Sequence, residues 1–453
     1  MEDLQTLRAA AEAALAYAGS VDDRPAFPPA DAVAGLAAFD EPLPETGTDV
    51  ADTLRLLDRA GSPATVASTG TDYFGFVVGG VHPAALGTAW LADAWDQNAA
   101  LPVMSPVAAR VHDVVRDWLV DLLRLPASTG VVFTTGATVA NATGLAAARD
   151  ALLERAGWDV QADGLFGAPE ITVVVGAQRH STLSKSLGLV GLGRDRVIEV
   201  PADDQGRLRA EELPDVSGPV LVCAQAGEVN TGAFDPFDRV ADWADAPGRD
   251  TWVHVDGAFG LWALADPSRA HLVAGLDRAD SWATDGHKWL NVTYDCGIAF
   301  VRDPAALRRT FTAVAGYLPP DEGFEAMHHT PQSSQRARQL EVWAVLRSLG
   351  RGGVAELVQR TSDTAVAIAD RLRAGGLEVV NDVVLNQVLV RAGNPAATTA
   401  LVAAVQADGR IWCGGTQWQG APAMRISVSS WKSSPADADT VATAVLECAR
   451  VSA

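Results

Sequence analysis

Between about residues 130 and 303, short apolar runs rich in β-branched residues alternate with segments of helical character. Such runs predict strands buried on both faces, and the helical segments predict crossovers that make neighbouring strands parallel. The pattern therefore predicts an α/β domain with a mostly parallel sheet, which binds ligands beyond the carboxyl ends of its strands. The runs lie at residues 131–133, 171–175, 219–224, 252–256 and 297–301.

The segments before and after these strands differ from them in composition and in the secondary structure that they predict. Residues 1–69 are rich in alanine and acidic residues, and we expect them to form a helical arm interrupted by prolines. Residues 70–318 form the expected large domain. Residues 319–453 contain long helical segments and a few short apolar runs, which predict a small α+β domain.

Charge and composition exclude several classes of function. The 453 residues include 35 basic and 56 acidic residues, a net charge of −21, so the surface repels nucleic acid and anionic lipid. No apolar run approaches the ~18 residues of a membrane-spanning helix, and the acidic N-terminus does not resemble a secretory signal. The four cysteines are scattered, so we expect a cytoplasmic protein with reduced thiols and no zinc site.

One lysine is distinctive because the chain contains only three, at positions 185, 288 and 432. Lys288 lies between His287 and Trp289, shortly after the apolar stretch SWAT. A lysine that is removed from water has a lowered pKa and can form a Schiff base with a carbonyl compound. The alternative is a surface lysine whose stem lies along apolar neighbours.

Three further motifs follow strands of the predicted sheet. Asp256 ends the run WVHVD, where its carboxylate either meets a cation such as a protonated pyridine nitrogen or caps the next helix. The small residues of TTGAT (134–138) either bring backbone amides to a phosphate or form an ordinary N-cap turn. His180 follows the run at 171–175 and either stacks on a flat cofactor or serves as a capping or core histidine.

The motifs FTTGATVAN, RHS, HVDGA and HKW preceded by ADSW occur in an order that resembles the group II decarboxylases dependent on pyridoxal phosphate (PLP). This family includes the aromatic-amino-acid, glutamate and histidine decarboxylases. The resemblance runs from about Gly70 to the C-terminus and includes the segments YFGFVVGGVHPAALGTAWLADAWDQN and GGTQWQGAPAMRISVSSW. It implies PLP fold type I, pyridoxal 5'-phosphate as cofactor, and a homodimer with the active site at the interface.

The resemblance also implies roles for individual residues. Lys288 would bind the PLP aldehyde, Asp256 would pair with the ring nitrogen, and His180 would stack on the ring. Arg425 would meet the substrate carboxylate, unless it is a surface arginine of a strand. The remaining contacts with the cofactor would come from Ala137, Thr138, Glu228, Ala258, Asp285 and His287.

Several positions depart from the family pattern. Glu228 stands where many members have Thr or Asn near the phenolic oxygen of PLP, and Asp285 stands where some have Asn near the phosphate. Members also have a mobile-loop tyrosine that donates a proton after CO2 leaves, but the expected loop at 323–334 contains none. It contains His328 and His329, which are therefore the candidate proton donors.

The favoured function is decarboxylation of an L-amino acid to an amine. An aromatic or other uncharged side chain is favoured, because the expected substrate residues are mainly apolar or aromatic and Arg425 is the one nearby cation that the sequence suggests. The alternatives are C–C cleavage of a β-hydroxy or phosphorylated amine, decarboxylation coupled to oxidative deamination, and PLP binding without turnover. The expected substrate residues, which core packing would also explain, are Tyr73, Phe74, Phe76, Val78, His82, Trp412 and Trp418.

Overall fold

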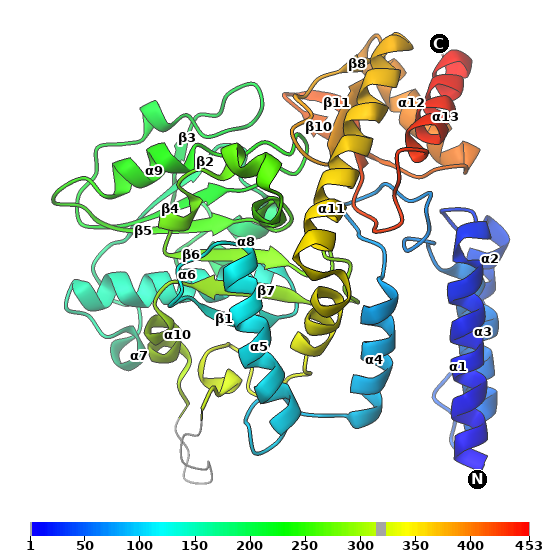
Figure 1. Cartoon of the computed structure of the whole chain (residues 1–453), viewed down its shortest axis with the longest axis horizontal. Coiled ribbons are helices and arrows are strands. Elements are labelled where there is room, and N and C mark those ends of the chain that lie inside the picture. Colours follow the sequence, from blue (N-terminus) through cyan, green and yellow to red (C-terminus); the bar gives the residue numbers. More distant parts are fainter. Residues whose placement is uncertain (1, 314–322, 453) are drawn as a thin grey trace.

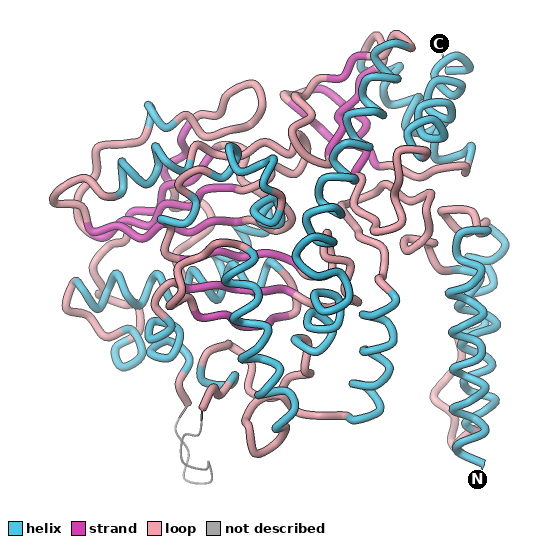
Figure 2. The backbone as a smooth tube through the Cα atoms, in the orientation of Figure 1, coloured by secondary structure: helices cyan, strands magenta, loops and turns pink. Residues whose placement is uncertain are grey.

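The computed structural model describes residues 2–313 and 323–452. Its large domain is built on a seven-stranded sheet in the order β1-β7-β6-β5-β4-β2-β3 (Figures 1 and 2). Strands β2 to β6 run parallel to one another, and β7 pairs antiparallel with both β1 and β6. The expected mostly parallel sheet is confirmed. The strands are β1 Gly130–Thr134, β2 Thr172–Gly176, β3 Ile198–Val200, β4 Pro219–Gln225, β5 Asp250–Asp256, β6 Ser281–Asp285 and β7 Gly297–Val301.

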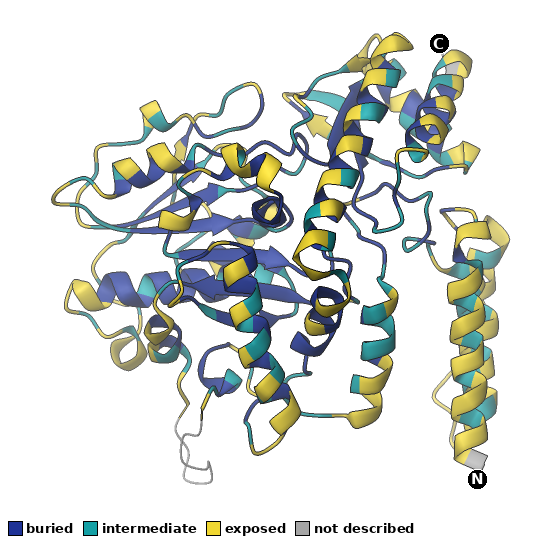
Figure 3. Ribbon diagram, viewed as in Figure 1, coloured by how far each residue is buried: buried dark blue, intermediate teal, exposed yellow. Residues whose placement is uncertain are grey.

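Helices cover both faces of this sheet, which is why its central strands are apolar along their whole length (Figure 3). One face packs against α6 Ala137–Arg155, α8 Ser181–Leu189 and α10 Pro304–Phe311. The other packs against α5 Pro106–Leu122, α9 Phe237–Ala244 and the first half of α11 Gln339–Ala374. A short helix, α7 Val160–Asp163, follows α6.

The small domain has an antiparallel sheet in the order β10-β11-β9-β8, formed by β8 Glu378–Val379, β9 Gln387–Arg391, β10 Gly414–Trp418 and β11 Ala421–Ser427. The second half of α11 packs on it with α12 Pro395–Asp408 and α13 Asp437–Ser452. Helix α11 therefore belongs to both domains, and Gly350, with φ 64° and ψ 177°, interrupts it. The expected domain boundary at residue 318 lies outside the described residues.

The N-terminal arm is helical, as its composition indicates. It consists of α1 Glu2–Ser20, α2 Ala30–Gly35 and α3 Val50–Gly61, and it lies beside the rest of the molecule rather than within it (Figure 1). Helix α4 Pro83–Trp95 follows. Within residues 2–313 and 323–452, none of the helices is both long and apolar enough to cross a membrane.

The segment between α3 and α4 joins the small domain, although the sequence places it in the large one. Trp412 N donates to Asp72 O at 2.9 Å, and Phe74 N donates to Trp412 O at 2.8 Å. Ser427 N, at the end of β11, donates to Phe74 O at 2.9 Å. These bonds extend the small domain toward the carboxyl edge of the large sheet.

Candidate active site

Lys288 lies at the carboxyl edge of the large sheet, three residues after Asp285 ends β6. Its Nζ is 2.9 Å from Asp285 Oδ2, and the side chains are 22% and 3% exposed. The amine is therefore paired and largely removed from water. The other two lysines have different settings, because Lys185 is exposed on α8 and Lys432 Nζ pairs with Asp22 Oδ2 at 2.8 Å.

Asp256 ends β5, next to β6, and is only 3% exposed. Ala258 N donates to its Oδ1 at 3.3 Å. Burial raises the pKa of Asp256, and the nearby His180 and Lys288 partly oppose this effect. A buried carboxylate favours a cationic partner, which a protonated pyridine nitrogen would provide.

A neutral histidine lies behind Asp256 in the core. His254 Nε2 is 2.9 Å from Asn141 Oδ1, and its Nδ1 is 2.8 Å from Ser281 Oγ. Burial lowers the pKa of His254 to about 3, so the ring is neutral at physiological pH. His254 therefore does not supply a positive charge that would balance Asp256.

His180 caps α8, as one of the two interpretations of the sequence expects, and it lies within electrostatic reach of the other site residues. Thr182 N donates to His180 Nδ1 at 3.3 Å, and Thr182 Oγ1 lies 2.7 Å from the same nitrogen. The side chain interacts electrostatically with Asp256, Lys288 and Arg425. Burial lowers the pKa of His180, which favours a neutral ring that can lie flat on an aromatic cofactor.

The N-terminus of α6 forms a cradle without a side-chain cap. Its N-cap residue is Gly136, and Ala137 N donates to Asp285 Oδ1 at 2.5 Å. His287 Nε2 lies 3.6 Å from the same oxygen. A Cβ atom on Gly297 would lie 2.3 Å from the Gly136 backbone, so a glycine is needed there for β7 to approach the helix start. Apart from Ala137 N, which donates to Asp285, the positive end of this helix suits a phosphate group.

Thr138 is the second residue of α6, and Ala258 follows shortly after the end of β5. Thr138 O accepts a hydrogen bond from Ser186 Oγ at 2.8 Å, which fixes the start of α6 against α8. Ala258 O accepts a hydrogen bond from Asp285 N at 2.9 Å. The two strand ends that carry the acidic residues are thereby joined.

Glu228 corrects one expectation, because its carboxylate is used within its own turn. Glu228 Oε2 accepts hydrogen bonds from Asn230 N and Thr231 N, both at 2.7 Å. Burial raises the pKa of Glu228, and these hydrogen bonds oppose the rise. A carboxylate held in this way stabilises the turn, and its contacts give no support for a role at the cofactor.

Arg425 is half-buried on β11 and faces the site rather than the outer surface. Its Nη1 donates to Val229 O at 3.1 Å, in the turn that follows β4. Burial lowers the pKa of Arg425, and Glu228 partly opposes this effect. The guanidinium is within electrostatic reach of His180.

The side chains of residues 73–76 have different surroundings: Tyr73 and Phe76 contact Trp412, and Phe74 lies in the core of the small domain. The ring of Tyr73 stacks on Trp412, with centroids 5.0 Å apart and planes 5° apart, and Phe76 stacks on Trp412 at 5.4 Å. Phe74 points the other way and is 2% exposed in the core of the small domain. The expectation that Phe74 contacts substrate is therefore corrected, because successive side chains of an extended segment face opposite sides.

Other expected substrate residues have structural contacts. His82 caps α4 by accepting a hydrogen bond from Ala84 N at 3.2 Å, and its ring meets Trp431 edge-on. Trp418 is 2% exposed in a small core cluster. Val78 O accepts a hydrogen bond from Ser429 Oγ at 3.2 Å. The side-chain contacts of His82 and Trp418 support the packing alternative for these two residues.

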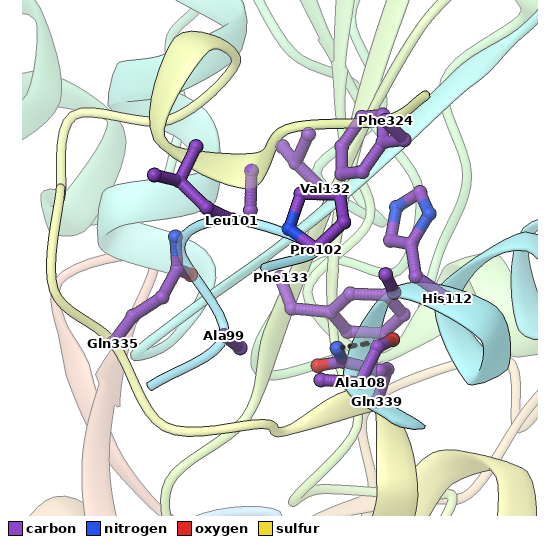
Figure 4. Close-up of a pocket in the computed structure, with 12 residues that line it drawn as sticks. Ala99, Leu101, Pro102, Ala108, His112, Val132, Phe133, Phe324, Gln335 and Gln339 are labelled. Carbon is purple, nitrogen blue, oxygen red and sulfur yellow. Dashed lines mark hydrogen bonds between the residues drawn. The ribbon is translucent and has the colours of Figure 1, made fainter. Parts of the chain in front are cut away.

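His328 and His329 lie in a buried cluster of their own beside α5. His328 Nε2 is 3.2 Å from Glu325 Oε2, and His329 Nδ1 is 2.8 Å from Glu325 O. Phe324 stacks on His329 at 4.6 Å and on His112 at 3.6 Å, beside a small pocket (Figure 4). The structure brings the two histidines together, but in the described residues no contact joins them to Lys288 of the same chain.

Tyr294 is a site residue that the sequence did not reveal. Its ring stacks on His287, with centroids 4.2 Å apart and planes 28° apart, and 57% of the residue is exposed. Gly79 is a second one, because a Cβ atom there would lie 1.9 Å from Lys288 O. The only signal for Tyr294 was its position six residues after Lys288, and Gly79 gave no signal beyond belonging to a glycine pair.

These residues fit PLP. The paired lysine, the buried carboxylate without a fixed cation, and the positive end of α6 match the aldehyde, the ring nitrogen and the phosphate of this cofactor. With the sheet topology, they define a PLP-dependent enzyme of fold type I.

Comparison with known proteins identifies the family. Residues 63–392 match the pyridoxal-dependent decarboxylase conserved domain. The chain is 31% identical to L-2,4-diaminobutyrate decarboxylase of Rhizobium meliloti (strain 1021) over 407 residues, which cover 83% of this chain and 73% of that protein. It therefore belongs to the pyridoxal-dependent decarboxylase family, whose cofactor is PLP and whose members are carboxy-lyases.

Two further comparisons come from rice. The chain is 32% identical to tryptophan decarboxylase 1 of Oryza sativa subsp. japonica over 289 residues, which cover 58% of this chain and 55% of that protein. The chain thus spans little more than half the length of this relative. The crystal structure of Oryza sativa TDC with PLP and tryptamine has a TM-score of 0.89 at 24% identity, covering 100% of this chain and 98% of that one, which shows the shared fold.

Proposed function

We propose that this protein decarboxylates an L-amino acid with an uncharged, preferably aromatic, side chain to the corresponding amine. The observation that carries the proposal is the stacked aromatic wall of Tyr73, Phe76 and Trp412 beside a half-buried Arg425. One guanidinium pairs with one carboxylate in bidentate geometry, so it does not serve two carboxylates of an acidic substrate at once.

Each residue of the site has a separate role in the proposed reaction. Bound PLP would supply the electron sink that accepts the electron pair left by departing CO2. Lys288 binds the cofactor aldehyde, Asp256 holds the ring nitrogen in its protonated form, and His180 covers one face of the ring. Arg425 orients the α-carboxylate. Ala137, Thr138 and His287 hold the phosphate at the start of α6.

The names of the relatives do not agree on one class of substrate. The Rhizobium meliloti protein is named for diaminobutyrate, whose side chain is cationic, and the rice protein is named for tryptophan. A cationic side chain requires an acidic partner, but Glu228 is engaged by its own turn, and Asp285 is engaged by Ala137 and Lys288. These contacts favour the uncharged class.

We further propose a homodimer whose interface completes the site. The arm exposes Leu4, Leu7 and Leu15 at 72%, 62% and 57%, which is unusual for helices of a monomer. If His328 or His329 donates the proton that forms the amine, it acts on the site of the second chain, because both lie apart from Lys288 of their own chain.

A screen of amino acids tests the substrate class. The PLP-loaded enzyme would be given tryptophan, tyrosine, phenylalanine, glutamate and 2,4-diaminobutyrate, and CO2, amine and aldehyde would be measured. We expect CO2 and amine in equal amounts from at least one aromatic amino acid. Release of CO2 from glutamate or diaminobutyrate alone would contradict the proposed class, and aldehyde in place of amine would indicate oxidative deamination.

A further inference from the structure

Three alternate residues of β5, Trp252, His254 and Asp256, face the side of the large sheet that α6 covers (Figure 1). All three are buried, and His254 is completely enclosed. A Cβ atom on Gly144 of α6 would lie 2.9 Å from His254 Cε1, so a glycine is needed there for the ring to fit under the helix. The chain therefore makes room for a polar ring in a layer that is otherwise mainly apolar.

The hydrogen bonds in this layer run in one direction. His254 is neutral, and the Asn141 oxygen that lies 2.9 Å from its Nε2 can only accept, so Nε2 carries the proton. His254 Nδ1 therefore accepts the hydroxyl proton of Ser281, whose Oγ is 2.8 Å away. Trp252 Nε1 donates to the same Oγ at 2.8 Å, which leaves the hydroxyl proton available for His254.

The chain of donors ends at the amide nitrogen of Asn141. This nitrogen is buried and has no hydrogen-bond partner among the residues that the structure describes. Asp256 lies beyond it, because His254 and Asp256 are neighbours on one face of β5, about 6–7 Å apart along the strand. Burial raises the pKa of Asp256, and the side chain of Asn141 is one of the groups that lower it. The reverse orientation of Asn141 would instead turn an oxygen, which also only accepts, toward this carboxylate.

We propose that the hydrogen-bond chain from Ser281 presents the amide protons of Asn141 to Asp256 and keeps this carboxylate ionised. This inference rests on the proposed pairing of Asp256 with the ring nitrogen of PLP and adds the groups that maintain it. An ionised carboxylate favours the protonated ring nitrogen, whereas a neutral carboxyl group does not. Asn141 and His254 are therefore positioning residues, since they act on the cofactor through Asp256.

The alternative is that the chain only satisfies polar groups that are buried under α6. Hydrogen bonds in either direction would serve that purpose, and their loss would lower the stability of the fold without changing the protonation of the cofactor. The position of the proton on His254 and the protonation of the PLP ring therefore separate the two roles.

The first measurement locates the proton of His254 in the native PLP-loaded enzyme. The histidines would be labelled with the heavy isotope of nitrogen, and the NMR signal of His254 would be assigned by its loss in His254→Gln. We expect a neutral ring with its proton on Nε2 at neutral pH. A proton on Nδ1, or on both nitrogens, would overturn the inference and leave the pairing of Asp256 with the cofactor standing.

The second measurement follows the ring nitrogen of isotope-labelled PLP by NMR while the pH is raised. In Asn141→Ala, the loss of a hydrogen bond to a charged group should lower the pH at which this nitrogen loses its proton by about one unit or more. Ser281→Ala, which removes the donor to His254 Nδ1, should shift it in the same direction by a smaller amount. Thr143→Ala is the matched control and should titrate like native enzyme, because Thr143 is equally buried on α6 but donates to Val139 O of its own helix.

The outcomes distinguish this inference from the role proposed for Asp256. An unchanged titration in Asn141→Ala would overturn the inference alone. A ring nitrogen that is unprotonated in native enzyme at neutral pH would overturn the pairing of Asp256 as well. If Asn141→Ala did not bind PLP, the titration of Ser281→Ala and the proton position on His254 in native enzyme would decide.

Discussion

Asp256 and Asp285 are both buried acids at the carboxyl edge of the large sheet, yet they have different partners. Asp285 is neutralised within the protein by Lys288 and by the first amide of α6. Asp256 is buried, and the charges of His180 and Lys288 partly oppose the effect of burial on its pKa. These contacts support the separate roles that we propose for the two carboxylates, in cofactor attachment and in the electronic state of the ring.

Replacing Asp256 should separate cofactor binding from turnover. Asp256→Ala should retain much of its PLP, because Lys288 and the α6 cradle remain, but kcat should fall about 100-fold or more. The cofactor content would be measured from the visible absorption and kcat from CO2 release. Asp150→Asn, which changes a buried acid paired with Arg149 far along α6, serves as the control. A kcat near the native value in Asp256→Ala would show that this carboxylate is only structural.

At the scale of elements, the strand ends and turns bring the site together. The segment at residue 79 packs directly on the backbone of Lys288, and Asn291 Nδ2 donates to Trp289 O at 2.6 Å and to Ser429 O at 3.0 Å. The turn after β6, the segment before α4 and the end of β11 are thereby tied together. The geometry of Lys288 depends on all three segments.

A methyl group at Gly79 should disturb this junction. In Gly79→Ala the new Cβ would lie 1.9 Å from Lys288 O, so the turn that holds the lysine has to move. Overpacking of this kind costs about 1–3 kcal/mol, and we expect the affinity for PLP to fall about tenfold. Equilibrium dialysis measures the loss. Gly87→Ala is the matched control, because a Cβ atom at that position of α4 meets nothing within 4 Å. Equal affinities of the two variants would contradict the proposed packing.

Strand β5 carries a histidine that makes stability depend on pH. The unfolded chain protonates His254 near pH 6.5, but the folded chain does so only near pH 3, because burial lowers its pKa. Between these values the unfolded state binds more protons, so stability falls as the pH falls, by up to about 1.4 kcal/mol per pH unit. The contribution is fully present above pH 6.5.

Calorimetry between pH 7 and pH 4 tests this dependence. The melting temperature of the native protein should fall more steeply with decreasing pH than that of His254→Gln, which does not titrate. The exposed His271 provides the control His271→Gln, which should keep the native slope. If the melting temperatures of native protein and His254→Gln fell equally steeply with decreasing pH, a group other than His254 would determine the loss of stability.

The sequence predicts some elements of this fold well and others poorly, for physical reasons. Strands β4, β5 and β7 are continuous apolar runs because helices cover both faces of the sheet. Strand β10 begins with two glycines and alternates between exposed and covered residues, so it carries no such signal. Strand β6 was noticed only as an apolar stretch before Lys288, since SWATD is too short and mixed to be assigned.

Some residues of the candidate site could likewise be predicted from the sequence, and others could not. Residues that follow predicted strands, such as Asp256 and His180, could be placed from the sequence because parallel strands end at one edge. Phe74 could not be separated from Tyr73, because the bonds with Trp412 and Ser427 decide which side faces the core. Tyr294 could not be found because its contact with His287 depends on the path of an irregular turn.

At the scale of the whole molecule, the exposed arm requires an explanation. Leu4 and Leu15 are eleven residues apart, about three helical turns, so they lie on one side of α1. That side is exposed in the single chain (Figure 3). A second copy of the chain would cover it, consistent with the proposed homodimer.

Sedimentation at micromolar concentration tests the dimer. We expect a mass twice the 47.3 kDa of one chain for the native protein. Replacing Leu4 and Leu15 with aspartate should shift the equilibrium toward single chains and lower turnover with it. Phe166→Asp, at a 99% exposed position of the large domain, should leave the mass unchanged. A native protein that sediments as a single chain would contradict the proposal.

The central claim is that Lys288 binds the cofactor, and one measurement addresses it directly. The native protein loaded with PLP would be reduced with borohydride, digested and mapped by mass spectrometry. The account predicts that the cofactor is fixed on Lys288 alone, since this is the lysine that is paired with a buried acid beside the α6 cradle. Label on Lys185 or Lys432, with Lys288 unmodified, would contradict the assignment of the active site.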